Sequence, residues 1–299
     1  MSFGSNTVRL LIVRDGPGGG VEQIEHRQTG TRLGEELRDG GTLAPEAVRR
    51  TLDAAAEFAH AAHEYGAELV CIATSAVRRT SDRAAFARRV LDVTGAPLRV
   101  LTGEEEAAAS YRGATDGAPH EGRRIGVLDI GGGSTEIAIG CDGTLLETGS
   151  LEIGSVRVAE RFPALLGGAP GAPARNAARG ARAYVAEMLA SLGTLEPVET
   201  LVCVAGTPLT IGALNAASHV DEVSGSTLER AELDGTIARL LDLDLDERRV
   251  LAGMLAQRAD IIVGGALVLS EAMRILGVAS GRLEANDLLL GVLLAASSP

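Results

Sequence analysis

The stretch LDIGGGSTEIAIG (residues 128–140) places one carboxylate, three consecutive glycines and two hydroxyl side chains between two apolar runs. The apolar runs predict two strands, with Asp129 at the end of the first. Glycine backbone can adopt positive φ and approach a ligand closely, because no Cβ is in the way. The turn therefore predicts an anion-binding loop, with an ordinary glycine-rich hairpin as the alternative. The residues of this loop are Gly131, Gly132, Gly133 and Ser134.

The same pattern occurs twice in the chain. FGSNTVRLLIV (3–13) aligns without gaps on IGGGSTEIAIG (130–140), an offset of 130 − 3 = 127. LVCIATS (69–75) matches LVCVAGT (201–207), an offset of 201 − 69 = 132. Two nearly equal offsets indicate an internal duplication, and hence two similar domains.

Strand and helix signals alternate along both halves, which is typical of an α/β sheet with parallel members. Residues 45–66 predict a long helix that begins with Pro45 and ends before Gly66. The polar stretch GATDGAPHEGRR (113–124) interrupts the alternation. We therefore predict a boundary near residue 123, with domains at 1–123 and 124–299.

Composition limits the classes of function. Of the 299 residues, 45% are hydrophobic, which is typical of a globular protein. The formal net charge of −12 argues against a broad surface for nucleic acid or membrane. The sequence contains no lysine, which excludes a Walker-type phosphate loop. No apolar run approaches the ~20 residues that span a bilayer, and no signal peptide opens the chain, so we expect a cytoplasmic protein.

The cysteines carry no metal-binding or disulfide spacing. Cys71 and Cys203 lie inside apolar runs that predict buried strands. A buried cysteine acts as a small hydrophobic residue, so we interpret these two as structural.

The stretch TGEEEAA (102–108) supplies acids at the start of a predicted helix. Thr102 and Glu105 have the spacing of a capping box, which explains Glu105 structurally. Glu106 has no such explanation and is a candidate to deprotonate an attacking water. The alternative is that all three glutamates simply favour the positive end of the helix dipole.

Small and basic residues follow two predicted strands. TSAVRR (74–79) places Ser75 and Arg78 after the first, and the duplicate places Gly206 and Thr207 after the second. Open α/β sheets bind ligands at such strand ends. Arg78 is a candidate phosphate clamp, because its planar guanidinium can bind phosphate with two hydrogen bonds. We expect Arg9 and Arg32 to add positive potential for an anionic substrate.

Together these motifs resemble those of the exopolyphosphatase/guanosine pentaphosphate phosphohydrolase family of the actin-like ATPase superfamily. GSNTVRLL, ATSAVR, GEEEA, DIGGGSTE, AGT and RADIIVGGALVL occur in that family's order over nearly the whole chain. The resemblance implies two ribonuclease H-like domains with the active site in a cleft between them. It implies hydrolysis of the terminal phosphate of polyphosphate or of the pentaphosphate alarmone by a glutamate-activated water, with Mg²⁺ (or Mn²⁺) assisting.

The resemblance assigns roles to matching residues. Glu106 matches the catalytic base, Asp129 resembles a metal- or water-positioning acid, and Glu136 resembles a second acid near the cation. Ser5 and Asn6 resemble one phosphate loop. The other predicted substrate-binding residues are Ser75, Arg78, Gly131, Gly132, Gly133, Ser134, Gly206 and Thr207.

Three features depart from the family. Ser2 occupies the place of an aspartate, and the strand before the first glycine turn is missing: either the sequence begins too late or the first domain lacks this strand. Near the C-terminus, LEANDLLLG replaces GLREG. The altered acid motivates an alternative function, a non-catalytic sensor of polyphosphate or alarmone. A small-molecule kinase is disfavoured by the GEEEA and TSAVR matches. Because short members of the family can pair, the resemblance also implies that this protein can form a homodimer.

Overall fold

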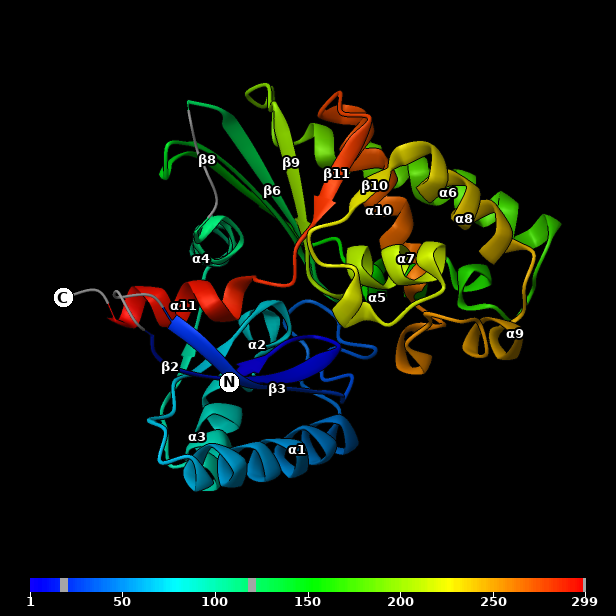
Figure 1. Cartoon of the computed structure of the whole chain (residues 1–299). Helices are drawn as coiled ribbons and strands as arrows, with labels where there is room; N and C mark the ends of the chain where they lie inside the picture. The colour runs from blue at the N-terminus through cyan, green and yellow to red at the C-terminus, as the bar shows by residue number, and fades with distance from the viewer. Residues whose placement is uncertain (17–20, 118–121, 298–299) are drawn as a thin grey trace. The chain divides into compact units, whose positions relative to one another are not determined.

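The computed structural model of the protein describes residues 1–16, 21–117 and 122–297 (Figure 1). The chain forms two compact units. The first consists of Met1–Glu106 with Val292–Pro299, and the second of Ala107–Gly291.

This division differs from the boundary near residue 123 that we predicted from the sequence. It falls inside helix α4 (Gly103–Thr115), whose last nine residues belong to the second unit. Ala107 and Tyr111 of this helix share a buried cluster with Ile125 and Val127 of the second unit. Residues 118–121 of the polar stretch lie outside the described residues.

The first unit is built on a five-stranded sheet in the order β3-β2-β1-β4-β5. β1, β2 and β3 pair antiparallel, whereas β1, β4 and β5 pair parallel. The strands are β1 (Ser2–Phe3), β2 (Thr7–Asp15), β3 (Val21–Gly30), β4 (Cys71–Ala73) and β5 (Leu98–Val100).

The second unit repeats this sheet and adds one strand, in the order β10-β11-β9-β6-β7-β8. β6, β7 and β8 pair antiparallel, and β6, β9 and β11 pair parallel. The strands are β6 (Arg124–Ile130), β7 (Thr135–Cys141), β8 (Thr144–Leu151), β9 (Thr200–Val204), β10 (Thr227–Glu229) and β11 (Ser280–Leu283).

The register of the two sheets confirms the internal repeat. Ser2 lies opposite Arg9 in β2 and opposite Ile72 in β4. At the equivalent positions, Asp129 lies opposite Glu136 in β7, and it also lies opposite Val204 in β9. The alignment of the sequence with itself therefore predicts the pairing of strands residue by residue.

The strand that we predicted to be missing from the first unit is present in short form. β1 has two residues, whereas its counterpart β6 has seven. Ser2 and Phe3 nevertheless pair with both β2 and β4, so the expectation that this place in the sheet is empty is wrong.

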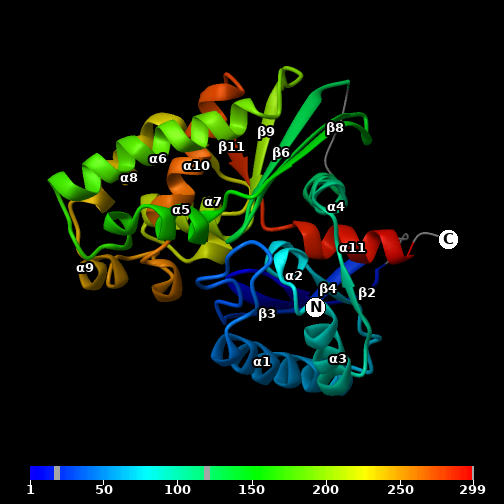
Figure 2. The ribbon, with the colours of Figure 1, turned by 180° about the vertical axis from the view of Figure 1, so that it is seen from behind.

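The helices of the first unit follow the sequence pattern with one exception. α1 (Pro45–Glu64) begins at the predicted proline, and α3 (Arg83–Thr94) ends at the left-handed Gly95. Both lie on the same face of the sheet (Figures 1 and 2). The exception is α2 (Ser75–Arg79), a helical turn that we did not predict in the stretch after the strand. That strand ends at Ala73.

In the second unit, helices cover both faces of the sheet (Figure 2). Leu128, Ile130 and Ile137 face a large core with the helices α6, α8 and α10, whereas Val127 and Ala138 face α4. The other helices of this unit are α5 (Ser155–Arg161), η2 (Pro163–Leu166), α6 (Ala172–Ala190), α7 (Gly206–Ala216), η3 (Val220–Glu222), α8 (Arg230–Leu241), α9 (Leu245–Arg249), η4 (Ala256–Arg258) and α10 (Ile262–Ile275). α11 (Leu288–Ser297) begins in the second unit and ends in the first.

The described helices include none with both the length and the apolar composition that a bilayer span requires. Cys71 and Cys203 are buried within strands, as predicted. Burial raises the pKa of the Cys203 thiol to about 12, so this thiol stays protonated and packs as a hydrophobic side chain. The predicted α/β class with two similar units is confirmed.

Candidate active site

The two glycine turns close in the same way. The N–H of Gly131 donates to the carbonyl of Ser134 at 3.0 Å, and the N–H of Gly4 donates to the carbonyl of Thr7 at 3.0 Å. The same turn therefore follows β6 and β1. In both turns the first amide is used internally, so it is not one of the donors that a bound anion would find.

The second glycine turn does not use a left-handed backbone. None of residues 131–133 has a positive φ, so that prediction is wrong. Instead, the chain after β8 packs directly against the turn. A Cβ on Gly154 would lie 2.5 Å from the carbonyl carbon of Gly132, and the N–H of Val156 donates to that carbonyl's oxygen at 3.0 Å. The turn is thus held from behind by backbone contacts.

Three predicted substrate-binding side chains are buried yet hold a polar atom without a protein partner among the described residues. These atoms are the Ser5 Oγ, the Asn6 Oδ1 and the Thr207 Oγ1. The three side chains are at most 5% exposed. Buried polar atoms in proteins are nearly always hydrogen-bonded, so such exceptions call for a ligand or water.

In the first unit, the predicted residues gather at one edge of the sheet. The Ser5–Asn6 turn follows β1, Ser75 follows β4, and Glu106 comes shortly after β5. These three strands are parallel neighbours, so their carboxyl ends share one edge.

Glu106 and Arg78 bind each other in this unit. Arg78 Nη1 donates to Glu106 Oε1 and to the Leu101 carbonyl, the latter at 3.1 Å. The Glu106 side chain is 5% exposed and that of Arg78 20%. Arg83 donates to the carbonyls of Val77 and Arg78 and so fixes the end of α2. We had predicted the base and the clamp separately, and their contact is not evident in the sequence.

The residue before Glu106 has the structural role predicted for it. Glu105 accepts a hydrogen bond from the Thr102 N–H at 2.8 Å, and Thr102 Oγ1 accepts from the Glu105 N–H at 3.2 Å. This capping box and the Arg99 guanidinium hold the pKa of Glu105 below its usual value. Glu105 and Glu106 therefore differ in surroundings although they are neighbours.

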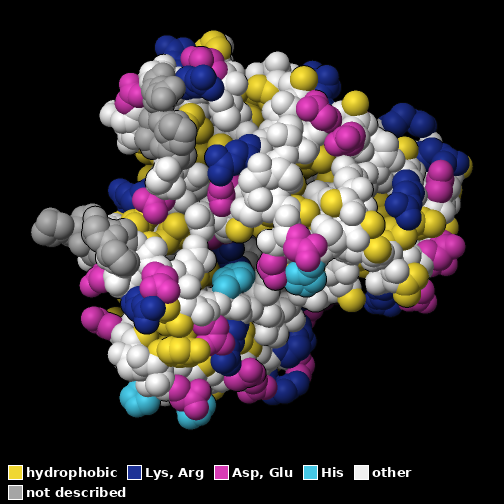
Figure 3. All heavy atoms as spheres, viewed as in Figure 1, with side chains coloured by type: hydrophobic (Ala, Val, Ile, Leu, Met, Phe, Trp, Pro, Cys, Tyr) yellow, Lys and Arg dark blue, Asp and Glu magenta, His cyan; other side chains and the backbone are white. Residues whose placement is uncertain are grey.

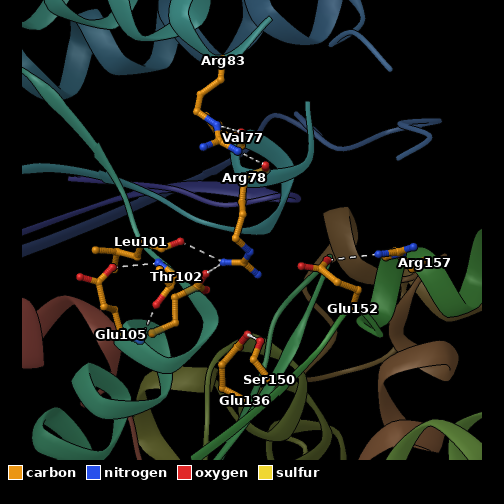
Figure 4. Close-up of polar contacts among 11 residues, drawn as sticks. Val77, Arg78, Arg83, Leu101, Thr102, Glu105, Glu136, Ser150, Glu152 and Arg157 are labelled. Atoms are coloured by element: carbon orange, nitrogen blue, oxygen red, sulfur yellow. Dashed lines mark hydrogen bonds and ion pairs between the residues drawn. The ribbon is translucent and has the colours of Figure 1, made fainter. Parts of the chain in front are cut away.

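In the second unit, Asp129 and Glu136 are cross-strand neighbours on β6 and β7. Directly opposed residues of an antiparallel pair share one face of the sheet. Asp129 is 7% exposed and accepts from Ser110 Oγ at 2.5 Å, and Glu136 is 3% exposed and accepts from Ser150 Oγ at 2.9 Å (Figure 4). Each carboxylate is therefore oriented by a serine.

These two carboxylates fit a hard divalent cation. Mg²⁺ is commonly bound through one or two carboxylates and completed by substrate phosphates and water. The described residues contain no group of three or more His, Cys, Asp or Glu side chains able to hold a metal. A cation on Asp129 and Glu136 would therefore need further oxygen ligands from outside the protein side chains.

The turn from β9 into α7 lies at the same edge as Asp129, because β9 and β6 are parallel neighbours. Its first residue, Ala205, has φ 72° and ψ −176°, a backbone region that is essentially restricted to glycine. Arg258 is 7% exposed and packs on the next residue: a Cβ on Gly206 would lie 2.0 Å from its guanidinium carbon. Gly265 likewise leaves room for Thr207, because a Cβ added at Gly265 would lie 2.5 Å from Thr207 Oγ1.

Arg258, Glu152 and Arg157 are close to the predicted residues but were missed by the sequence analysis. Arg258 lies at the start of RADIIVGGALVL, a motif that we used for the resemblance without assigning a role to its arginine. Glu152 and Arg157 follow β8, and no repeat of that segment in the first half draws attention to them.

The described geometry defines an α/β protein with buried polar atoms and carboxylates at strand ends, as in phosphate-handling enzymes. The model of the Ppx/GppA phosphatase family matches residues 11–295. The chain belongs to this family. It is accordingly a hydrolase of phosphate compounds.

Named relatives agree with this assignment. The chain is 36% identical to exopolyphosphatase 2 of Mycobacterium tuberculosis over 97% of this chain and 95% of that protein. It is 30% identical to the guanosine-5'-triphosphate,3'-diphosphate pyrophosphatase of Photobacterium profundum, covering 98% of this chain and 57% of that protein. A crystal structure of the Aquifex aeolicus Ppx/GppA family member has a TM-score of 0.80 at 25% identity and covers 99% of this chain and 95% of that one.

Proposed function

We propose that the protein releases terminal orthophosphate from inorganic polyphosphate and, as a second substrate, from guanosine pentaphosphate. The observation that carries this proposal is the set of buried polar atoms at Ser5, Asn6 and Thr207 that have no hydrogen-bond partner in the described part of the chain. Hydroxyl groups of Ser5 and Thr207 can donate to phosphate oxygens. The names of the two relatives support this substrate class.

Glu106 is the proposed general base. Its carboxylate takes a proton from the attacking water as the water's oxygen bonds to the terminal phosphorus and the bridging P–O bond breaks. The shortened chain leaves with the bridging oxygen, and the protein then returns the proton to solvent. Arg78 orients Glu106 through one side of its guanidinium group. The other side of this group is the proposed binding place for the reacting phosphate.

Asp129 and Glu136 are the proposed ligands of Mg²⁺ or Mn²⁺. When bound, such a cation neutralises charge on phosphate oxygens during the displacement. Both carboxylates are buried and lie on one face, so the protein supplies a fixed pair of ligands. Ser110 and Ser150 hold these carboxylates in place.

The experiment is a phosphate-release assay with polyphosphates of several lengths and the pentaphosphate, with Mg²⁺ or with a chelator. Glu106→Gln should lower release by about 10²- to 10⁴-fold, the usual contribution of a general base. Glu105→Gln is the matched control: it removes the adjacent, solvent-facing carboxylate that caps α4, so it should cost stability and leave release intact. Equal loss in both variants would refute the assignment of Glu106.

A second candidate function, a sensor that binds polyphosphate or alarmone without turnover, rests on one observation. Ser2 stands where the second unit has Asp129, so the first unit has no acid at that register position. Calorimetric binding of tripolyphosphate without any phosphate release, at all Mg²⁺ and Mn²⁺ concentrations tried, would favour the sensor.

A further inference from the structure

An ion pair outside the predicted site lies beside the second glycine turn. Arg157 Nη1 is 3.1 Å from Glu152 Oε2, and the two side chains point toward one another (Figure 4). The side chain of Arg157 is 26% exposed and that of Glu152 35%. Both residues belong to the second unit, between β8 and the first turn of α5.

Glu152 follows the strand that pairs with β7. Ser150 in β8 lies opposite Glu136, which lies opposite Asp129. Glu152 comes two positions after Ser150, directly past the last residue of β8. A further carboxylate therefore stands at the end of the strand next to the one that carries Glu136.

Arg157 is anchored to the glycine turn itself. Its N–H donates to the Gly132 carbonyl at 3.4 Å, next to the bond from Val156 to the same oxygen. The main chain of Arg157 is therefore fixed beside the turn, and its side chain reaches back to Glu152.

We propose that Glu152 and Arg157 form an exchangeable ion pair, in which a phosphate group of the substrate displaces Glu152 from the Arg157 guanidinium. This inference rests on the proposed function. Arg157 is then a phosphate-binding residue, and Glu152 is a positioning residue that acts through it. Glu152 holds the guanidinium near the turn when the site is empty and competes with phosphate for it when substrate arrives.

The physical basis is the difference in strength between the two partners. A partly exposed ion pair contributes little to stability, so the contact with Glu152 is easily given up. A polyphosphate end group offers two or more charged oxygens to the planar guanidinium, which binds such groups with paired hydrogen bonds. An arginine that is already paired with an acid also binds other anions less readily than an unpaired arginine would.

The experiment is a double-mutant cycle with inorganic tripolyphosphate as substrate and inorganic phosphate as inhibitor. Glu152→Gln should lower KM and the phosphate inhibition constant by roughly two- to fivefold, with kcat changed less than twofold. Arg157→Gln should raise both constants by about tenfold or more. Arg157→Lys should fall between wild type and Arg157→Gln, because it keeps the charge and loses the planar fork.

The cycle separates exchange from simple charge repulsion. In the Arg157→Gln background, Glu152→Gln should change neither constant, since Glu152 acts through Arg157. Glu196→Gln is the control, because Glu196 pairs with exposed Arg124 elsewhere on the same unit and should leave KM unaltered.

Three results would overturn the proposal. An equal gain from Glu152→Gln with and without Arg157 would show general repulsion. An unchanged or higher KM in Glu152→Gln would show that the pair is only structural. A wild-type protein that neither binds tripolyphosphate nor releases phosphate would refute the proposed function as well, whereas the first two results leave that function standing.

Discussion

Ala205→Gly is expected to stabilise the protein and weaken substrate binding at the same time. Ala205 has φ 72° and ψ −176°, where a residue other than glycine carries strain of about 1–3 kcal/mol. Glycine relieves this strain but has more freedom in the unfolded chain, which costs about 0.4–1 kcal/mol. The net gain is on the order of 1 kcal/mol, or about 2–4 °C in the melting temperature of a unit of 150–250 residues.

The effect on binding follows from the place of Ala205 in the turn before Gly206 and Thr207. A glycine at this position lets the turn sample other backbone angles, so the Thr207 hydroxyl is less well placed for phosphate. We expect KM for tripolyphosphate to rise severalfold while the free energy of unfolding rises.

The assays are urea unfolding and phosphate release, with Ala216→Gly as control. Ala216 lies in the last turn of the same helix, is exposed and has no positive φ, so glycine there should destabilise by about 0.5–1 kcal/mol. If Ala205→Gly destabilises the protein as much as Ala216→Gly does, the strain is not real.

Three further predictions test other parts of the molecule. Gly154→Ala should destabilise the protein by about 1–3 kcal/mol and lower phosphate release, because the added Cβ meets the Gly132 carbonyl. Gly235→Ala is the control in thermal melts: it lies on an exposed helix face with open space around it, so it should stabilise the protein by up to about 1 kcal/mol. Arg248→Met should lower the free energy of unfolding in urea by about 2–4 kcal/mol, because the fully buried guanidinium donates to the Leu165 carbonyl at 2.7 Å. An effect no larger than that of Arg249→Met, at an exposed arginine, would contradict this. Asp129→Asn should raise the Mg²⁺ concentration for half-maximal phosphate release at least tenfold; unchanged metal dependence would place the cation elsewhere.

The duplication made much of the fold predictable. The glycine turns and the strands that follow them recur at nearly constant offsets, so β2 and β4 could be placed against β7 and β9 before any coordinates, whereas the short β1 was missed. The capping box at Thr102 and Glu105 was equally accessible, because it depends on four consecutive residues. These features are local or repeated.

The features that the sequence did not reveal depend on contacts between distant residues. The approach of Gly154 to the Gly132 carbonyl explains why residue 154 is glycine, yet no spacing rule links the two. The pairing of Arg78 with Glu106 joins two helices, α2 and α4, through residues that are 28 positions apart in the sequence. Basic and acidic side chains are interspersed over the face in Figure 3, so the partner of a given arginine cannot be chosen from composition.

The register shared by the two sheets has an electrostatic consequence. At the same two positions the first sheet carries Ser2 and Arg9, and the second carries Asp129 and Glu136. The duplicated backbone repeats, but its charge at these positions does not: one copy carries an arginine where the other carries two carboxylates. Under the proposed function, a divalent cation therefore binds at the second sheet and is repelled from the equivalent place in the first.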